Sequence, residues 1–343
     1  MISPKVWLAL PVLLISLSLM GKPANAAASP NSGTRGRARA VEMVRERSFR
    51  LQNVEVRYDL DTDYTPDAAA IALWRRVEKR VMKQYPDARA GPPFRGNFTY
   101  HCDFMFLAGR MRYGKQPTGH LRSGVPGEVQ TSTLGRAETL VCAREGVPTG
   151  GEISAHAPPL DSLAISSVLG LRQPSRRNWS WIRPGAVGKM VYSRLSRARF
   201  SFTQKEANGD DYRWVFRRTA RGLELTFLVA SNRSQSGGRY VYLRGKFSDF
   251  HSVKGLLLPE RAEESFFGGV NIPDPVRRDI LTHIRYRVDS PSNVPKDYLI
   301  VWPKGATVID ERIDRVFHIK SPTTLSDRDI FLRLKKRDGG PHK

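Results

Sequence analysis

Apolar and polar residues alternate along most of this chain, and that alternation limits its possible folds more than any other feature. It is clearest between residues 98 and 106, where five side chains share one parity: Phe98, Tyr100, Cys102, Phe104 and Phe106. Alternation of this kind predicts a β-strand with one apolar face. It recurs at 53–60, 198–202, 212–216 and 223–229. Strands at such spacing favour a large antiparallel sheet over alternating strand–helix units.

The same pattern extends the sheet through the rest of the chain. Gly109 predicts a turn into a return strand at 110–113. Further strands are predicted at Val129–Arg136, Glu138–Arg144, Tyr240–Phe247, Leu256–Arg261, Ile280–Val288 and Asp297–Val301. The predicted fold class is therefore mainly β (α+β), with a large curved antiparallel sheet or an incomplete β-barrel covered by one or two helices.

Two segments are candidate covers for the sheet. Thr65 is a good N-cap and Pro66 suits the first helical position. Apolar residues then recur at helical spacing, which predicts a helix over Pro66–Gln84 with a stripe of Ile71, Trp74, Val77, Val81 and Tyr85. The second segment, Leu160–Leu171, is apolar apart from Asp161 and predicts a short helix or lid.

A curved sheet with an aromatic face must cover that face. The space beneath the helices is either filled at the density of an ordinary protein core or left as a hollow that suits a lipid tail. The residues predicted to line such a hollow are Trp74, Phe104, Phe106, Phe200, Phe202, Trp214, Phe216 and Phe227.

The first 26 residues predict export. A basic start ending at Lys5, an apolar run over 6–20 and the sequence Ala24-Asn25-Ala26 together form a signal peptide with a cleavage site. An uncleaved membrane anchor is the alternative. With no cysteine before Cys102 to take a lipid anchor, we expect a protein of the periplasm or the extracellular space. Residues 27–39 read as a disordered leader, 40–337 as a single β-rich domain with a short helix at its start (Ala40–Ser48), and 338–343 as a frayed tail.

The chain is strongly basic, with a formal net charge of +23. Such a surplus attracts polyanions, and for an exported protein anionic envelope components are the nearest ones. Adaptation of the surface for solubility is the alternative, and the lack of a basic tail argues against nucleic acid. Four arginines occupy the polar parity of predicted strands or the turn before them, and should face water as a row: Arg197, Arg199, Arg213 and Arg217.

Two cysteines, Cys102 and Cys142, suggest one disulfide in an oxidising compartment. Both sit at an apolar parity of their strands, which makes the bridge feasible. Two free buried thiols are the alternative.

The sequence contains none of the motifs that announce a reaction. Gly-x-Ser-x-Gly, the P-loop and His-Glu-x-x-His are all missing. His101 and Asp103 are neighbours on one strand, and we interpret them as a solvent-facing polar edge rather than a catalytic pair. We therefore predict a monomer that is not an enzyme, with no catalytic residue, cofactor or metal.

Three stretches carry a resemblance to a known family. Residues 104–113 have a glycine turn and an Arg/Tyr return strand, residues 250–261 end in Gly255-Leu256-Leu257-Leu258-Pro259-Glu260-Arg261, and residues 301–311 contain a P-x-G-x-x-V-x-D element. Together with the signal peptide they resemble exported bacterial proteins related to the periplasmic lipoprotein carriers, the LolA-like superfamily. The resemblance implies an incomplete antiparallel barrel closed by helices, which holds acyl chains without a catalytic residue. This chain is longer and more basic than the carriers.

Three hypotheses for function follow. The first is an exported, non-enzymatic carrier for a lipid-like or acylated ligand. The second is a basic envelope protein that binds anionic polymers or membrane headgroups through its arginines, with a solid core. The third is an exported hydrolase whose catalytic groups converge from distant positions.

Overall fold

The computed structural model describes residues 30–64, 71–72, 96–118, 127–133, 136–142, 150–155, 165, 168–169, 184–205, 209–233, 238–267, 275–330 and 332. The predicted signal peptide, most of the predicted helix at 66–84 including Trp74, most of 160–171 and the tail at 338–343 lie outside these ranges. Within the two predicted covers, Ile71, Ala72, Ile165, Val168 and Leu169 are helical. Among the described residues, no helix is long and apolar enough to cross a membrane.

One sheet of fifteen strands organises the described chain. Its strands are β1 (Asn53–Tyr64), β2 (Gly96–Leu107), β3 (Arg110–Pro117), β4 (Gly127–Thr133), β5 (Arg136–Cys142), β6 (Gly151–Ser154), β7 (Val191–Arg194), β8 (Arg199–Lys205), β9 (Asp211–Thr219), β10 (Gly222–Arg233), β11 (Arg239–Val253), β12 (Leu256–Phe266), β13 (Arg277–Val288), β14 (Thr307–Asp310) and β15 (Arg315–His318). The predicted class, a mainly β fold built on a large antiparallel sheet, is confirmed.

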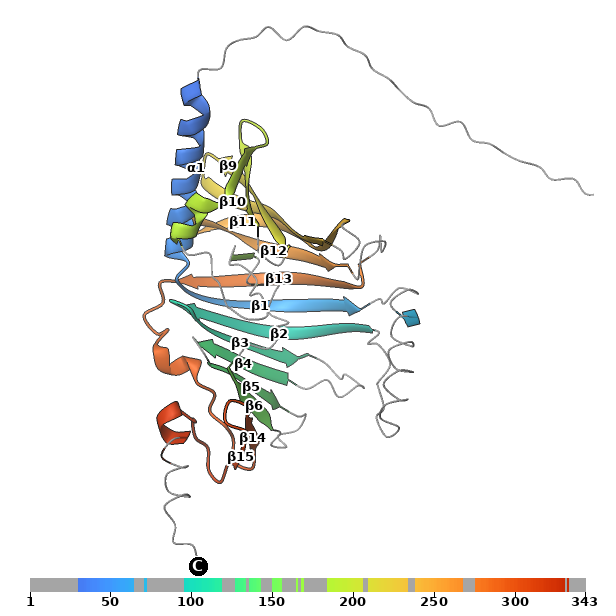
Figure 1. Ribbon diagram of the computed structural model, residues 1–343, viewed down its shortest axis with the longest axis vertical. Helices are drawn as coiled ribbons and strands as arrows, with labels where there is room; N and C mark the ends of the chain where they lie inside the picture. The colour runs from blue at the N-terminus through green and yellow to red at the C-terminus, as the bar shows by residue number, and fades with distance from the viewer. Residues whose placement is uncertain are drawn as a thin grey trace, which may run out of the picture.

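The strand order is β15-β14-β6-β5-β4-β3-β2-β1-β13-β12-β11-β10-β9-β8-β7 (Figure 1). The chain mostly folds as consecutive hairpins, and β1 joins two such series by pairing with β2 on one side and β13 on the other. Every pairing is antiparallel except that of β14 with β6. The sheet is open, and in the described chain β7 and β15 are its edges.

The sheet has an apolar inner face and a polar outer face. Alternate residues of β1 and β2 enter one hydrophobic core, which continues across β13, β12, β11, β10, β9 and β8. The side chains between them, such as Arg57 and His101, point to the other side and are exposed. This is the alternation that the sequence predicts for a sheet buried on one face.

Helix α1 (Pro30–Arg50) precedes the first strand and stands across the strand ends beside the β9–β13 half of the sheet (Figure 1). It begins ten residues before the predicted Ala40, so the prediction of a disordered leader is wrong for residues 30–39. Ala40 and Val44 pack into the inner core. The Arg37 guanidinium donates to the Gly188 carbonyl at 3.2 Å, and Arg218 donates to Gly36 at 3.5 Å. These long-range contacts hold a segment whose composition gives little helical signal of its own.

A second, smaller core lies at the β14 end of the sheet. It is built from β5, β6, β14 and the chain after β13, and its members are Leu140, Ile153, Ile300, Trp302, Ala306, Val308, Ile319, Leu325 and Ile330. The strand predicted at Asp297–Val301 is wrong. Residues Pro295–Tyr298 form a 3-10 helix, because Pro295 starts the turn and the Asp297 carboxylate accepts from the Val294 N–H at 3.0 Å.

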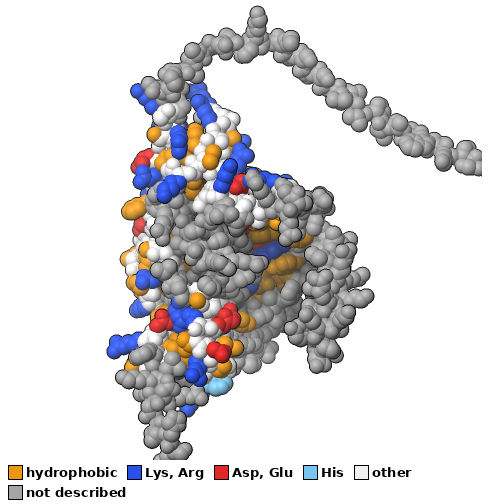
Figure 2. All heavy atoms as spheres, viewed as in Figure 1, with side chains coloured by type: hydrophobic (Ala, Val, Ile, Leu, Met, Phe, Trp, Pro, Cys, Tyr) orange, Lys and Arg blue, Asp and Glu red, His pale blue; other side chains and the backbone are white. Residues whose placement is uncertain are grey.

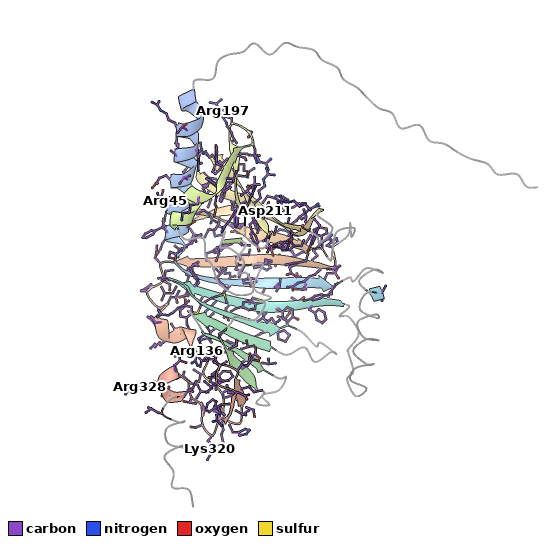
Figure 3. All side chains as sticks on the ribbon, viewed as in Figure 1. Arg45, Arg136, Arg197, Asp211, Lys320 and Arg328 are labelled. Carbon is purple, nitrogen blue, oxygen red and sulfur yellow. The ribbon has the colours of Figure 1, made fainter. Side chains whose placement is uncertain are left out.

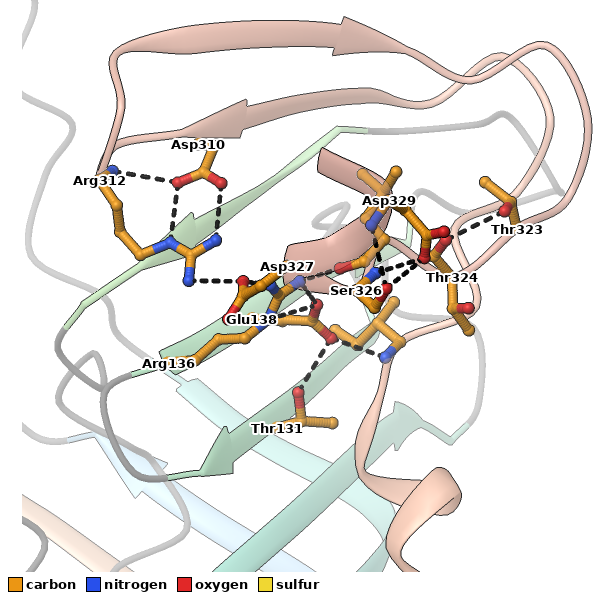
Figure 4. Close-up of polar contacts among 12 residues, drawn as sticks. Thr131, Arg136, Glu138, Asp310, Arg312, Thr323, Thr324, Ser326, Asp327 and Asp329 are labelled. Atoms are coloured by element: carbon orange, nitrogen blue, oxygen red, sulfur yellow. Dashed lines mark hydrogen bonds and ion pairs between the residues drawn. The ribbon is translucent and has the colours of Figure 1, made fainter. Parts of the chain in front are cut away.

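A buried ionic network fixes this second core to the sheet (Figure 4). Glu138 on β5 is 1% exposed and accepts hydrogen bonds from Arg136, from the Thr131 hydroxyl at 3.3 Å and from the Ile300 N–H at 2.7 Å. Arg136 also pairs with Asp327, which in turn pairs with Arg312 at 2.9 Å. The network thus connects the sheet to three separate positions of the C-terminal segment, Ile300, Arg312 and Asp327.

The predicted Cys102–Cys142 disulfide is not formed, since Cys102 is a free, buried thiol. The strand register explains why. Cys102 is opposite Lys115, Lys115 is opposite Glu128, and Glu128 is opposite Val141. Three strand spacings of about 4.8 Å separate the two positions, or about 14 Å, while bridged cysteines have Cα atoms within about 7 Å. Burial raises the pKa of the Cys102 thiol to about 12.

Candidate functional site

Most of the residues predicted to line a hollow meet on the inner face. Six belong to one core and are buried: Phe104, Phe106, Phe200, Phe202, Trp214 and Phe216. The rings of Phe200 and Phe216 stack with their centroids 5.6 Å apart, and Tyr212 stacks on Trp214 at 6.0 Å. The aromatic face therefore extends over several strands as one surface. Trp74 lies outside the described residues.

Phe227 is the exception, because it points to the outer face. The register between β10 and β9 shifts between Leu225 and Phe227, so that Leu225 opposes Phe216 and Phe227 opposes Val215. Leu228 then takes the inner position that simple alternation gives to Phe227. A β-bulge of this kind reverses the faces of all residues after it, and the alternating pattern gives no sign of where it occurs.

The aromatic face is not fully covered at its margins. Five aromatic residues pack against the core and remain partly exposed: Tyr64, Tyr192, Tyr242, Phe250 and Phe266. Figure 2 shows hydrophobic side chains in a recess of this view of the molecule, with a basic side chain among them. The inner face is thus a packed core with partly exposed aromatic margins.

Polar groups are built into the inner face as well. Arg277 on β13 binds the buried Asp279 carboxylate with Nε and Nη2, at 2.8 Å and 2.7 Å. The same guanidinium lies over the rings of Tyr64 and Phe266, at 5.3 Å and 5.0 Å from their centroids. Arg47 enters the interior from α1, where its Nη1 donates to the Leu169 carbonyl at 2.7 Å. Neither arginine was among the predicted site residues.

The outer face is rich in arginine. The predicted row is confirmed: Arg197, Arg199, Arg213 and Arg217 are all exposed. Arg199 and Arg217 are directly opposite one another on β8 and β9, and Glu224 pairs with Arg217 at 2.6 Å. Basic side chains are also spread along the long axis of the molecule, from Arg45 and Arg197 near one end to Lys320 and Arg328 near the other (Figure 3).

A groove of about 760 Å³ lies over the middle of the sheet, and most of its lining side chains come from the outer face of β1, β2, β3 and β13. Asp59 stands between two histidines there: its Oδ1 lies 2.5 Å from His101 Nδ1, and its Oδ2 lies 2.9 Å from His283 Nδ1. Three arginines line the same groove: Arg57, Arg112 and Arg285. His101 therefore faces solvent as predicted, with Asp59 of the neighbouring strand, rather than Asp103, as its partner.

The two histidines lower the pKa of the Asp59 carboxyl. Burial raises the pKa of the carboxyl, but hydrogen bonds and charge from His101 and His283 outweigh burial and hold the pKa below its ordinary value. A depressed carboxyl pKa stabilises the fold above the unfolded-state pKa, and that stabilisation is lost as the pH falls through the folded-state pKa. We therefore expect NMR titration of the wild type to place Asp59 below about 3.9.

Replacing both histidines, as His101→Gln with His283→Gln, should raise the Asp59 pKa to or above its ordinary value, because burial then acts with less opposition. An Asp59 pKa unchanged in the double variant would contradict the assignment.

The described residues offer no obvious catalytic or metal centre. They contain no group of three His, Cys, Asp or Glu side chains placed to hold a metal ion. The groove lining includes one thiol residue, Cys102, and its side chain is buried on the inner face of the sheet. The described residues thus combine an aromatic inner face with a charged outer groove.

No protein-family model matches the chain, and no curated protein is similar to it in sequence. Several solved structures are similar, including the following two. A DUF1329 family protein from Desulfovibrio piger has 8% sequence identity and a TM-score of 0.35, with 75% of this chain and 93% of that chain covered. A LolA superfamily protein from Nitrosomonas europaea has 10% identity and a TM-score of 0.36, with 76% of this chain and 96% of that chain covered.

Because both TM-scores are below 0.5, neither match says what this chain binds. The second match is to a member of the superfamily that the sequence resembles.

Proposed function

We propose that this chain is an exported, non-enzymatic carrier or binding protein for a lipid-like or acylated ligand of the cell envelope. The observation that carries the proposal is the continuous aromatic inner face, with its partly exposed margin. Apolar ligand sites are concave, mostly apolar and equipped with a few polar groups that fix orientation. The inner face offers that chemistry, since Arg277 and Arg47 are embedded among aromatic and aliphatic side chains.

Native mass spectrometry of the full chain purified from its own cell envelope, followed by lipid extraction, tests the proposal. We expect bound mass that resolves into acyl-chain species. Phe266→Ser should lower the affinity for added palmitate about tenfold, because burying a phenylalanine side chain is worth about 1.5–3 kcal/mol. Phe49→Ser removes a ring that is 70% exposed on α1 and serves as the matched control.

A protein that carries no acyl species and does not take up palmitate would exclude the carrier. Equal losses of affinity in the Phe266 and Phe49 variants would show that the inner face is not the site.

The outer arginines support a second candidate function, the binding of anionic polymers or membrane headgroups. Arg199 and Arg213 are exposed on this face. Binding through such charges weakens steeply with salt, because it depends on electrostatic attraction that salt screens. Co-sedimentation with vesicles containing phosphatidylglycerol, at low and high salt, separates this function from acyl-chain binding. Arg199→Gln with Arg213→Gln should weaken vesicle binding and leave palmitate uptake unchanged.

A further inference from the structure

Arg47 is a buried cation for which the described chain supplies no anion. Its side chain is 5% exposed, and Val44 and Leu51, about one helical turn before and after it, belong to the inner core. Nη1 donates to the Leu169 carbonyl at 2.7 Å. Nε and Nη2 are both buried, and among the described residues neither has a hydrogen-bond partner.

The charge is not neutralised in another way. Among the described residues, no carboxylate forms an ion pair with Arg47. Burial lowers the pKa of Arg47 to about 10, which leaves the guanidinium charged at neutral pH. The nearby Tyr286 is a phenol whose own pKa burial raises, and its hydroxyl donates to the Pro259 carbonyl at 2.7 Å. A buried charge of this kind is unfavourable unless an opposite charge meets it.

Other shielded arginines of the same protein show what is missing. Arg277 donates hydrogen bonds from Nε and Nη2 to the Asp279 carboxylate. Arg312 donates from the same two nitrogens to the Asp310 carboxylate, at 3.0 Å and 2.8 Å. This edge of a guanidinium binds the two oxygens of a carboxylate or phosphate side by side. In Arg47 these same two nitrogens have no hydrogen-bond partner among the described residues.

We infer that Arg47 binds the anionic head group, a carboxylate or a phosphate, of the acylated ligand, and this inference rests on the function proposed above. The vacant guanidinium edge would receive two oxygens of the head group. Because Val44 and Leu51 connect the site to the inner core, the acyl chain would continue from there onto the apolar face. The ligand class is therefore a single-headed anionic amphiphile rather than a neutral lipid.

The test compares ligands of equal chain length and different heads: palmitate, hexadecanol and palmitoyl lysophosphatidic acid. Binding to the full chain is measured by isothermal titration calorimetry. We expect the wild type to bind at least one anionic ligand ten times or more as tightly as hexadecanol, and the preferred anion distinguishes a carboxylate head from a phosphate head. Arg47→Met should abolish that preference, because it removes the group that meets the anionic head.

Arg50→Met is the matched control, since Arg50 lies one turn away on α1, is partly exposed and donates to the Lys254 carbonyl. It should retain the preference. Arg47→Lys keeps the charge but lacks the two-nitrogen edge, and should lose most of the preference.

The outcomes separate this inference from the function on which it rests. If the wild type binds none of the three ligands, the carrier function fails. If it binds hexadecanol as tightly as both anions, or if Arg47→Met keeps the preference, the carrier stands and the role of Arg47 is overturned. If Arg47→Met does not fold, Arg47→Lys, which keeps the charge, decides the question: a preference as large as that of the wild type would overturn the role of Arg47.

Discussion

Replacing Glu138 by alanine should destabilise the protein by about 3–5 kcal/mol, the usual effect of removing one partner of a buried ion pair. Arg136, which is 7% exposed, would keep its charge and lose the carboxylate beside it. The Ile300 N–H and the Thr131 hydroxyl would lose their acceptor at the same time. Urea unfolding followed by circular dichroism measures the loss.

Glu311→Ala is the matched control, because Glu311 is an exposed glutamate next to the same small core and its loss should change stability by less than about 0.5 kcal/mol. The loss of stability in Asp327→Ala should fall between those of the other two variants, because the Asp327 side chain contacts Arg136 but is itself 68% exposed. A loss of less than about 1 kcal/mol in Glu138→Ala would mean that the network does not hold the second core.

The second large effect is expected at Gly151, where a single methyl group has no room. A Cβ there would lie 2.0 Å from the Thr139 carbonyl oxygen and 2.7 Å from Cζ3 of Trp302. Gly151 also opposes Leu140 on one side and Val308 on the other. Gly151→Ala must therefore move β6 away from a neighbour, and we expect a loss of about 3 kcal/mol, at the upper end for overpacking.

Gly188→Ala provides the comparison, because a Cβ at Gly188 meets nothing within 4 Å. That variant should unfold within about 0.5 kcal/mol of the wild type. Near-UV circular dichroism should also change in Gly151→Ala, since the displaced backbone contacts a buried tryptophan. Equal stabilities for the two variants would refute the close approach.

The strands were predictable because one face of the sheet is buried. Alternation at 98–106 identifies β2, and the glycine turn at Gly109 identifies the hairpin into β3. Strand ends were less accurate: β12 continues to Phe266, beyond the predicted Arg261, because its last residues still pair with β11 and β13. The local alternation of apolar and polar residues indicates which face of a strand is buried, but it does not indicate which strands pair with it.

Features that depend on tertiary contacts were missed for the same reason. Helix α1 starts at Pro30, and its N-terminal half is held by contacts of Gly36 and Arg37 with distant residues, which a window of sequence does not show. Phe227 points to the outer face because of a bulge. The predicted disulfide does not form because the strand register, which only the folded sheet defines, keeps the two cysteines apart. The His101–Asp59–His283 cluster joins three strands, and its members are far apart in the sequence.

The candidate site likewise has one part that was predictable from the sequence and one part that was not. Its aromatic side was predicted, because aromatic residues at alternate positions mark a buried face. Its polar side was not. The vacant edge of Arg47 is recognised only by comparison with Arg277 and Arg312, whose equivalent nitrogens have carboxylate partners.

The pairing of β1 with β13 also determines when the sheet can be completed. Val54 pairs with Val288 and Tyr64 with Arg277, so each contact closes a loop of more than 200 residues. Contacts between such distant residues form slowly. While the chain is being made, β1 and β2 can pair, but the other edge of β1 stays open until nearly all of the protein has been synthesised. An unpaired edge is a template for aggregation, so the open edge of β1 is a point of aggregation risk in the newly made chain until β13 pairs with it.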